Sequence, residues 1–350
     1  MKRFLGKLIS FILLIVFACL IWYFFHGWIE RQIMKVKGVY YIHKGDQAYS
    51  QDNMAKTLEY YKKGLDYFPG HYEAWFNLGN IYAVYEDYYS AVNAYRNAIE
   101  HNPKFVMAKM NLGIVYSEDL GFFDEAITQF DEITQIRLFK LWIPFVYSNV
   151  KSIRGNRGIA YFNMGVAWKQ KAMYLPLEKK YLAYQYLGEA IEAYTKALKI
   201  LKKSYDIYYN RAIAHHLRGE SRAAGLDYCK AIKLEPMKFE AHYNLAVLLR
   251  GMKRYRESIS ELEKAALLVT ESPDVSGLQS AYIFNLLNEV SRRFITDGEY
   301  GTDRLSDEPK SGISYTYVNG RIVADDDFEK AMIKNFQTCA GFDIFNRDED

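Results

Sequence analysis

A spacing of small and aromatic residues that returns about every 34 residues constrains this chain more than any other feature of its sequence. The clearest copy runs from Tyr72 to Phe105. With Tyr72 as position 1, its positions 4, 7, 8, 11, 20, 24, 27 and 32 hold Trp75, Leu78, Gly79, Tyr82, Ala91, Tyr95, Ala98 and Pro103. The first four share one face of a helix, and positions 20, 24 and 27 share one face of a second helix. Small residues at positions 8, 20 and 27 would let the two helices approach closely, and the proline would end the second.

The spacing returns with varying quality in five further segments, which makes six units over residues 38–272. Their units begin at Gly38, Val106, Gly158, Tyr205 and Phe239. Lys44 and Thr57 depart from the pattern, and the unit from Val106 carries one extra residue near Leu120 and Gly121. Tandem self-similarity of this length is typical of repeat architectures.

This pattern resembles the tetratricopeptide repeat. The resemblance implies an all-α fold, a helix-turn-helix solenoid in which antiparallel helix pairs stack into a right-handed superhelix with a concave groove. It also implies that groove-facing residues occupy positions 2, 5, 6, 9, 12 and 13 of each first helix. Chaperone adaptors of this family grip a C-terminal carboxylate with cations at positions 2, 5 and 6. This chain has Met107, Asp206 and Glu240 at position 2, so binding of chaperone tails is not expected.

An uncharged run of eighteen residues, Leu8 to Phe25, predicts a transmembrane helix over about residues 8–28 within an anchor of residues 1–37. At 1.5 Å per residue the run reaches about 27 Å, close to the ~30 Å hydrocarbon core. Large residues follow the run where a signal peptidase requires small ones, so we expect no cleavage. Whether Cys19 is lipidated stays open, because Val16 to Cys19 resembles a lipobox only in part. Basic residues on the N-terminal side favour a cytoplasmic N-terminus and an extracytoplasmic repeat domain.

The remaining segments are predicted as follows. Two insertions, 139–157 and 173–186, are expected to pack on each other as a local extension of the core, with a partner or membrane contact as the alternative. Residues 273–297 would form a capping helix, and residues 298–350 an acidic tail with six basic and twelve acidic residues. Within it, the alternation around Asn319-Gly320 predicts a hairpin, and Asp325 would open a short helix to about Phe336.

Composition excludes several classes of function. Lys and Arg total 45 against 42 for Asp and Glu, a net charge of +3, so no nucleic-acid partner is expected. Three cysteines without a C-x-x-C pair exclude a disulfide scaffold and a zinc ribbon. The chain has no nucleotide-binding or hydrolase motif, so we expect no cofactor, no small-molecule substrate and no catalysis.

Two columns of residues form the candidate peptide groove. Position 6 holds asparagine in five successive units: Asn77, Asn111, Asn163, Asn210 and Asn244. An amide both donates and accepts, so such a column can pair with the backbone of an extended peptide. It resembles the superhelix of the O-linked N-acetylglucosamine transferase, which holds peptides in this manner. The alternative is that asparagine is simply common at this position of the repeat.

Position 5 beside them holds Phe76, Met110, Phe162, Tyr209 and Tyr243. Aromatic side chains can serve as anchors in desolvated groove sites, and the alternative is core packing against the next repeat. A further hypothesis is a metal-dependent enzyme, with a metal held by His215, His216 and His242 and with Glu240 nearby. The alternative is that these histidines are core residues whose hydrogen bonds are satisfied within the fold.

The sequence therefore predicts a non-catalytic scaffold that binds protein segments in its groove and holds a complex at a membrane. The alternative function is a structural accessory subunit of a larger membrane or envelope assembly, which would use its convex face and its insertions.

Overall fold

The computed structural model describes residues 2–136, 144–271, 277–296, 317–318 and 321–322. Contacts divide the chain into an N-terminal unit, Met1–Ile136, and a C-terminal unit, Arg137–Asp350. In the described part, every element is helical except one short β-hairpin, which confirms the all-α fold class.

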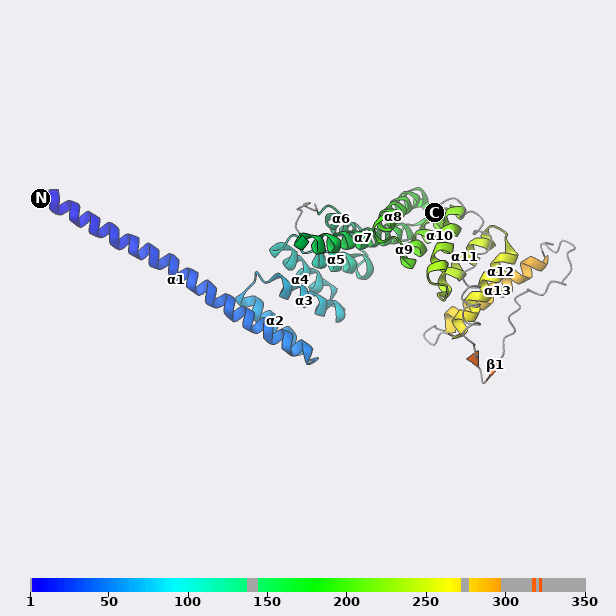
Figure 1. Ribbon diagram of the computed structural model, residues 1–350, viewed down its shortest axis with the longest axis horizontal. Helices are drawn as coiled ribbons and strands as arrows, with labels where there is room; N and C mark the ends of the chain where they lie inside the picture. Colours follow the sequence, from blue (N-terminus) through cyan, green and yellow to red (C-terminus); the bar gives the residue numbers. More distant parts are fainter. Residues whose placement is uncertain (1, 137–143, 272–276, 297–316, 319–320, 323–350) are drawn as a thin grey trace. The chain divides into compact units, whose positions relative to one another are not determined.

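The N-terminal unit consists of three stacked helix hairpins (Figure 1). Its elements are α1 (Lys2–Ser50), α2 (Met54–Tyr67), α3 (Tyr72–Val84), α4 (Tyr88–His101), α5 (Val106–Ile114), the π-helix η1 (Val115–Asp119) and α6 (Phe123–Thr134). Within it α1 packs on α2, α3 on α4 and α5 on α6, and α2–α3 and α4–α5 join successive hairpins. Side-chain caps set two of the helix starts, since Asn53 accepts from Lys56 N and Asp87 from Ser90 N, both at 3.2 Å.

A glycine against an aromatic ring closes the hairpins of this unit. A Cβ built on Gly79 would lie 2.6 Å from Tyr95 Cε1, and one on Gly113 would lie 2.6 Å from Phe130 Cε1. Gly45 meets the ring of Tyr61 in the same way. The glycine at position 8 therefore allows the close approach of the two helices that the spacing predicts, and the ring it admits comes from position 24.

The turn between the two helices of a repeat uses left-handed backbone. Position 15 has φ of 56° at Asp52, 60° at Glu86, 77° at Gly219 and 61° at Lys253. Gly121 (φ 69°) has the same role one residue later, because the extra residue of the third repeat is absorbed by η1. There Leu120 N donates to Val115 O at 3.1 Å, five residues back.

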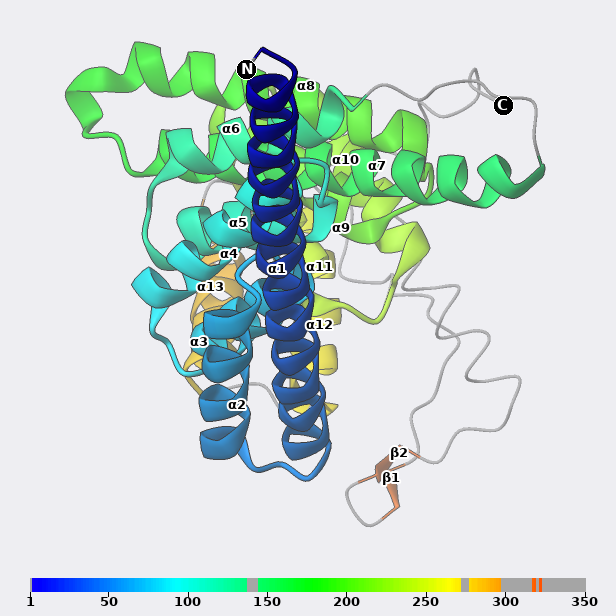
Figure 2. The ribbon, with the colours of Figure 1, turned by 90° about the vertical axis from the view of Figure 1, so that its left-hand side faces the viewer.

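Helix α1 continues without a break from the predicted anchor into the first repeat. Its 49 residues include the predicted transmembrane segment and the stretch after Gly38 that packs on α2 (Figure 2). Apolar side chains between Phe11 and Val36 are exposed, and burial begins at Gly38 and Ile42. By its length and composition, α1 could cross a membrane, because it contains an apolar window of mean hydropathy 2.2. Among the described residues, no other helix is long and apolar enough to do so.

The C-terminal unit begins with long helices and ends with a helix that covers the last hairpin. Its elements are α7 (Pro144–Met173), the 3-10 helix η2 (Leu177–Lys179), α8 (Lys180–Leu201), α9 (Tyr205–Leu217), α10 (Ser221–Leu234), α11 (Phe239–Gly251), α12 (Tyr255–Glu271), α13 (Gly277–Thr296), β1 (Tyr317–Val318) and β2 (Arg321–Ile322). Helix α13 buries Ile283, Leu286 and Val290 in a cluster with Leu262 and Ala265 of α12.

The predicted C-terminal hairpin is present, with Tyr317 opposite Ile322 and Val318 opposite Arg321. The predicted helix from Asp325 to about Phe336 lies outside the described residues, as does most of the acidic tail.

The expected packing of the two insertions on each other is wrong. Residues 144–157 form the first part of α7, whereas residues 173–186 run from its last residue through η2 into the start of α8. A helix of 30 residues is about 45 Å long, so its two ends cannot meet. The second insertion instead lengthens the α7–α8 hairpin and leaves its tip exposed, with Tyr174 at 79%, Leu177 at 91% and Tyr181 at 76% exposure.

Candidate functional site

The position-6 asparagines all lie half-buried on the first helix of a hairpin. Asn77 is on α3 and Asn111 on α5 in the N-terminal unit, whereas Asn163, Asn210 and Asn244 are on α7, α9 and α11 in the C-terminal unit. Within each unit, the position-6 asparagines therefore lie on the first helices of successive hairpins.

These amides bond to the preceding repeat. Asn77 Nδ2 donates to Tyr61 Oη at 3.4 Å, Asn111 Nδ2 to Asn80 Oδ1 at 2.8 Å, and Asn244 Nδ2 to Tyr209 Oη at 2.7 Å. Their sequence separations of 16, 31 and 35 residues hide these bonds from any local pattern. The amides are therefore held in place by the stacking of repeats.

In Asn77 and Asn244 the bond to the neighbour uses only one N–H. Within the described chain, no donor lies on Oδ1 of Asn77, Asn111 or Asn244. Each of the three consequently offers a fixed acceptor, and Asn77 and Asn244 also offer a second N–H, the pair that a peptide backbone requires.

Asn210 is bound differently. Its Oδ1 accepts from Lys169 Nζ at 2.6 Å, and its Nδ2 donates to Asp206 O at 2.8 Å. Burial lowers the pKa of Lys169. Asn210 therefore has fewer unpaired donors and acceptors for a partner than Asn77 and Asn244 have.

The aromatic column at position 5 contributes largely to packing. Phe76 meets Phe105 edge-on at 5.1 Å and Tyr95 at 6.0 Å, and Met110 is buried. Phe162 lies 6.0 Å from Tyr194. For these residues the core-packing interpretation fits the contacts.

Tyr209 and Tyr243 also pack against the core, but in addition they line a cavity of about 260 Å³ together with Asn244. Burial, followed by the charge of Glu240, raises the pKa of Tyr209 to about 12, so its hydroxyl is protonated at neutral pH. Tyr282 of α13, 60% exposed, forms another wall. We call this the C-terminal cavity.

A second cavity, of about 470 Å³, lies in the N-terminal unit where α1, α2 and α3 meet. It contains Asn77 and adds residues that the sequence prediction missed: Asp46, Tyr49, Asp52, Asn80, Val84 and Tyr85. Asp46, Asn80, Tyr49 and Val84 occupy positions 9, 12 and 13, so the repeat register would have found them had all groove positions been compared. We call it the aspartate cavity.

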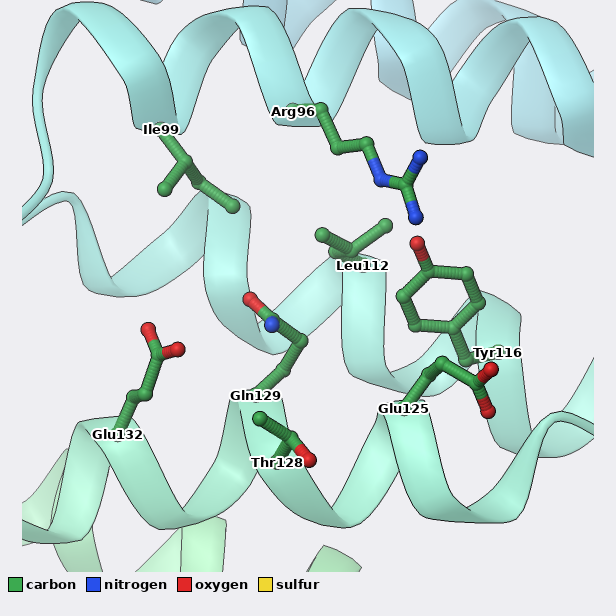
Figure 3. A pocket seen from close by; sticks show the side chains of 8 residues that line it. All are labelled: Arg96, Ile99, Leu112, Tyr116, Glu125, Thr128, Gln129 and Glu132. Atoms are coloured by element: carbon green, nitrogen blue, oxygen red, sulfur yellow. The ribbon is translucent and has the colours of Figure 1, made fainter.

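A third cavity, of about 250 Å³, lies between α4, α5 and α6, and its wall also includes Tyr116 of η1. Figure 3 shows Arg96 pointing toward the hydroxyl end of Tyr116, with Glu125 beside the ring. The Arg96 guanidinium is 5.8 Å from the Tyr116 ring. Glu132 at the other end forms an ion pair with Lys109. Two of the three charged residues in this cavity, Arg96 and Glu132, therefore already have partners within the chain.

The three histidines do not gather into a metal site. Their ring nitrogens meet separate partners: His215 meets Glu220 at 2.5 Å, His216 meets Tyr228 at 3.5 Å, and His242 meets Glu261 at 2.6 Å. Glu240 lines the C-terminal cavity instead. No group of three metal-binding side chains is placed together in the parts of the chain that the structure describes.

Comparisons with known proteins locate the repeats. Residues 72–105 and 239–268 match family models of the tetratricopeptide repeat. Sperm-associated antigen 1 of Rattus norvegicus is 32% identical over 31% of this chain and 11% of its own length. The peroxisomal targeting signal receptor of Eremothecium gossypii is 25% identical over 73% of this chain and 47% of the receptor. The chain thus spans less than half the length of these curated relatives.

Among solved structures, that of Pseudomonas aeruginosa pilF aligns over 73% of this chain and 99% of its own, with 14% identity and a TM-score of 0.49. The family-model matches fall on the α3–α4 and α11–α12 hairpins, one in each unit. The chain therefore contains tetratricopeptide repeats in both of its units.

Proposed function

We propose that this chain is a non-catalytic scaffold that binds extended segments of partner proteins along the first helices of its repeats and holds them at a membrane. The observation that carries the proposal is the C-terminal cavity, which brings together three of the predicted groove residues, Tyr209, Tyr243 and Asn244. The amide of Asn244 is already oriented by Tyr209, so binding a peptide costs little ordering of that side chain.

The bonding pattern of the asparagines supports recognition of backbone rather than of side chains. An amide oxygen that accepts a peptide N–H works with any sequence, because each non-proline residue supplies one such donor. Asn77 and Asn111 lie on successive repeats of the N-terminal unit, which favours an extended segment there.

The exposed apolar surface of α1 supports the membrane part of the proposal. Between Phe11 and Trp28 large apolar side chains face outward, and lipid would remove this surface from water. The basic residues before Leu8 favour an N-terminus in the cytoplasm with the repeats on the other side. Some proteins similar to this chain carry names of binding proteins, such as the peroxisomal targeting signal receptor.

The test is capture of partners from membranes by chemical crosslinking of the full-length protein. We compare it with a variant in which Asn77, Asn111, Asn163, Asn210 and Asn244 are changed to Ala. We expect stoichiometric partners to be lost from the variant. The matched control is Asn93→Ala with Asn97→Ala on α4, whose side chains lie off the predicted groove positions.

Because the asparagines also join repeats, the fivefold variant is paired with Tyr282→Ala, which leaves every inter-repeat bond in place. Loss of partners from both variants, with an unchanged helical circular-dichroism signal, is the expected outcome. Retention of the same partners by both would contradict groove binding.

A second candidate function is that of an accessory subunit that packs inside a larger assembly. The exposed apolar tip of the α7–α8 hairpin favours it, because a surface of this composition normally contacts another molecule.

A further inference from the structure

We propose that the aspartate cavity binds a lysine or arginine side chain of the partner segment. This inference rests on the proposed function and adds the chemistry of the bound residue. The cavity volume of about 470 Å³ lies within the range of ligand-binding pockets.

The cavity is negatively charged. Asp46 from α1 and Asp52 from the α1–α2 turn both line it, and no lysine, arginine or histidine does. Neither carboxylate forms an ion pair within the described chain. A cation that enters would therefore meet two uncompensated carboxylates.

The Asp46 carboxylate is held in place by a hydrogen bond from a buried tyrosine. Tyr61, 2% exposed, donates its hydroxyl to Asp46 Oδ1 at 2.6 Å, and Asn77 Nδ2 lies 3.4 Å from the same hydroxyl. Burial raises the pKa of Tyr61, so the hydroxyl stays protonated and donates at neutral pH. The second oxygen of Asp46 remains available to a ligand, and preorganisation of this kind favours binding.

The rim suits the long apolar stem of a lysine or arginine. Tyr49 is 55% exposed, Tyr85 56% and Val84 82%. A cation next to an aromatic ring and a carboxylate gains both a cation–π contact and a charge-assisted hydrogen bond. The same hairpin already contains a cation–π contact, with Lys63 Nζ 4.5 Å from the Tyr41 ring centre.

The occupant is a partner and not this chain's own ends. The C-terminal residues 298–350 carry six basic against twelve acidic residues, and two carboxylates repel such a tail. The basic N-terminus lies on α1 itself, and a continuous helix keeps Lys7 roughly 60 Å from Asp46. A basic stretch of another protein is the occupant that fits these charges.

The test uses the full-length protein in lipid nanodiscs and three pools of degenerate dodecapeptides, with a central Arg, Gln or Glu. Retained peptides are counted by mass spectrometry. We expect Arg peptides to be retained on the order of tenfold more than Gln peptides at low salt, and Glu peptides least.

The variant Asp46→Asn with Asp52→Asn keeps shape and removes both charges. We expect it to bind the Arg and Gln pools equally, whereas the control Asp66→Asn, on exposed α2 surface, keeps the preference. Equal retention of Arg and Gln peptides by the unaltered protein would overturn the inference while leaving groove binding intact. A preference that survives in the double variant would overturn it too, because the cation would then bind elsewhere.

Failure of the proposed function gives a different result. In that case no pool is retained above the level of empty nanodiscs, and the fivefold asparagine variant behaves like the unaltered protein. Both the inference and the proposed function would then be rejected.

Discussion

Position 24 of the repeat holds a tyrosine in four of the six units, and the surroundings of its hydroxyl differ between hairpins. Tyr61 donates to Asp46, and Tyr95 donates to Asn80 Oδ1 at 2.8 Å. Tyr194 is fully buried, and its hydroxyl has no partner in the described part of the chain. The difference follows from position 9, which is Asp46 or Asn80 in the first two repeats and Val166 in the fourth.

This contrast predicts opposite effects of the same substitution. Tyr95→Phe should lower the free energy of unfolding by about 1 kcal/mol, because it removes a hydrogen bond. Tyr194→Phe should leave it unchanged or raise it by up to about 1 kcal/mol, because it removes a buried polar group without a bond. Urea unfolding followed by circular dichroism measures both. A loss in Tyr194→Phe as large as in Tyr95→Phe would show that the Tyr194 hydroxyl is bonded.

Among the elements, the α7–α8 hairpin separates the two candidate functions. Its core side chains pack, since Leu187 is 4% exposed, but Leu177 and Tyr181 at the tip are 91% and 76% exposed. Such a tip adds nothing to the stability of the isolated chain. It is available to a partner.

Leu177→Ser with Tyr181→Ser should therefore change the free energy of unfolding by less than about 0.5 kcal/mol. Leu187 lies at a packed position of α8. Leu187→Ser should therefore lower the free energy of unfolding by several times more, about 2 kcal/mol or above. If the chain is an accessory subunit, the tip variant loses its crosslinked partners while remaining folded. If the tip variant crosslinks to the same partners as the unaltered protein, the tip is not part of the interface.

Helix hairpins could be predicted element by element because their signal is local. Gly79 and Tyr95 are 16 residues apart, within one hairpin, and their contact follows from the repeat register. The π-helix at Val115–Asp119 could not be predicted, because one extra residue can be absorbed by a loop or a helix and only packing decides. The uninterrupted course of α1 was missed for a related reason: the charges from Glu30 to Lys37 indicate the end of an apolar segment and carry no helix stop.

The site was predicted in part. The asparagine column follows from the register, but the bonds from Asn111 to Asn80 and from Asn244 to Tyr209 depend on how repeats stack. Phe76 and Phe162 have the contacts of packing residues, and position 5 alone does not separate an anchor from a core residue. Asp46 lies at groove position 9 and follows from the register, but its bond from Tyr61 of the next helix does not.

At the scale of the whole molecule, α1 joins the apolar segment rigidly to the first repeat. We predict that four alanines inserted after Lys35 keep this coupling, and that Gly-Ser-Gly-Ser inserted there abolishes it, because glycine weakens a helix. Spin labels at positions 31 and 56 report the distance across the insertion. The alanine chain should give a narrow distribution shifted by about 6 Å, and the Gly-Ser chain a broad one. Equally broad distributions in both and in the parent would show that α1 is not continuous.

The continuous helix also sets a height above the bilayer. Trp28 and Asp46 lie on the same helix, 18 residues or about 27 Å apart along its axis. In a membrane-anchored chain, the aspartate cavity is therefore carried at a fixed level and cannot bend down to the lipid. A partner that is itself anchored in the membrane would need about eight extended residues between its own membrane segment and its basic side chain to reach that level. The length of the helix would then select partners by the length of their juxtamembrane segment, and the two aspartates would select them by charge.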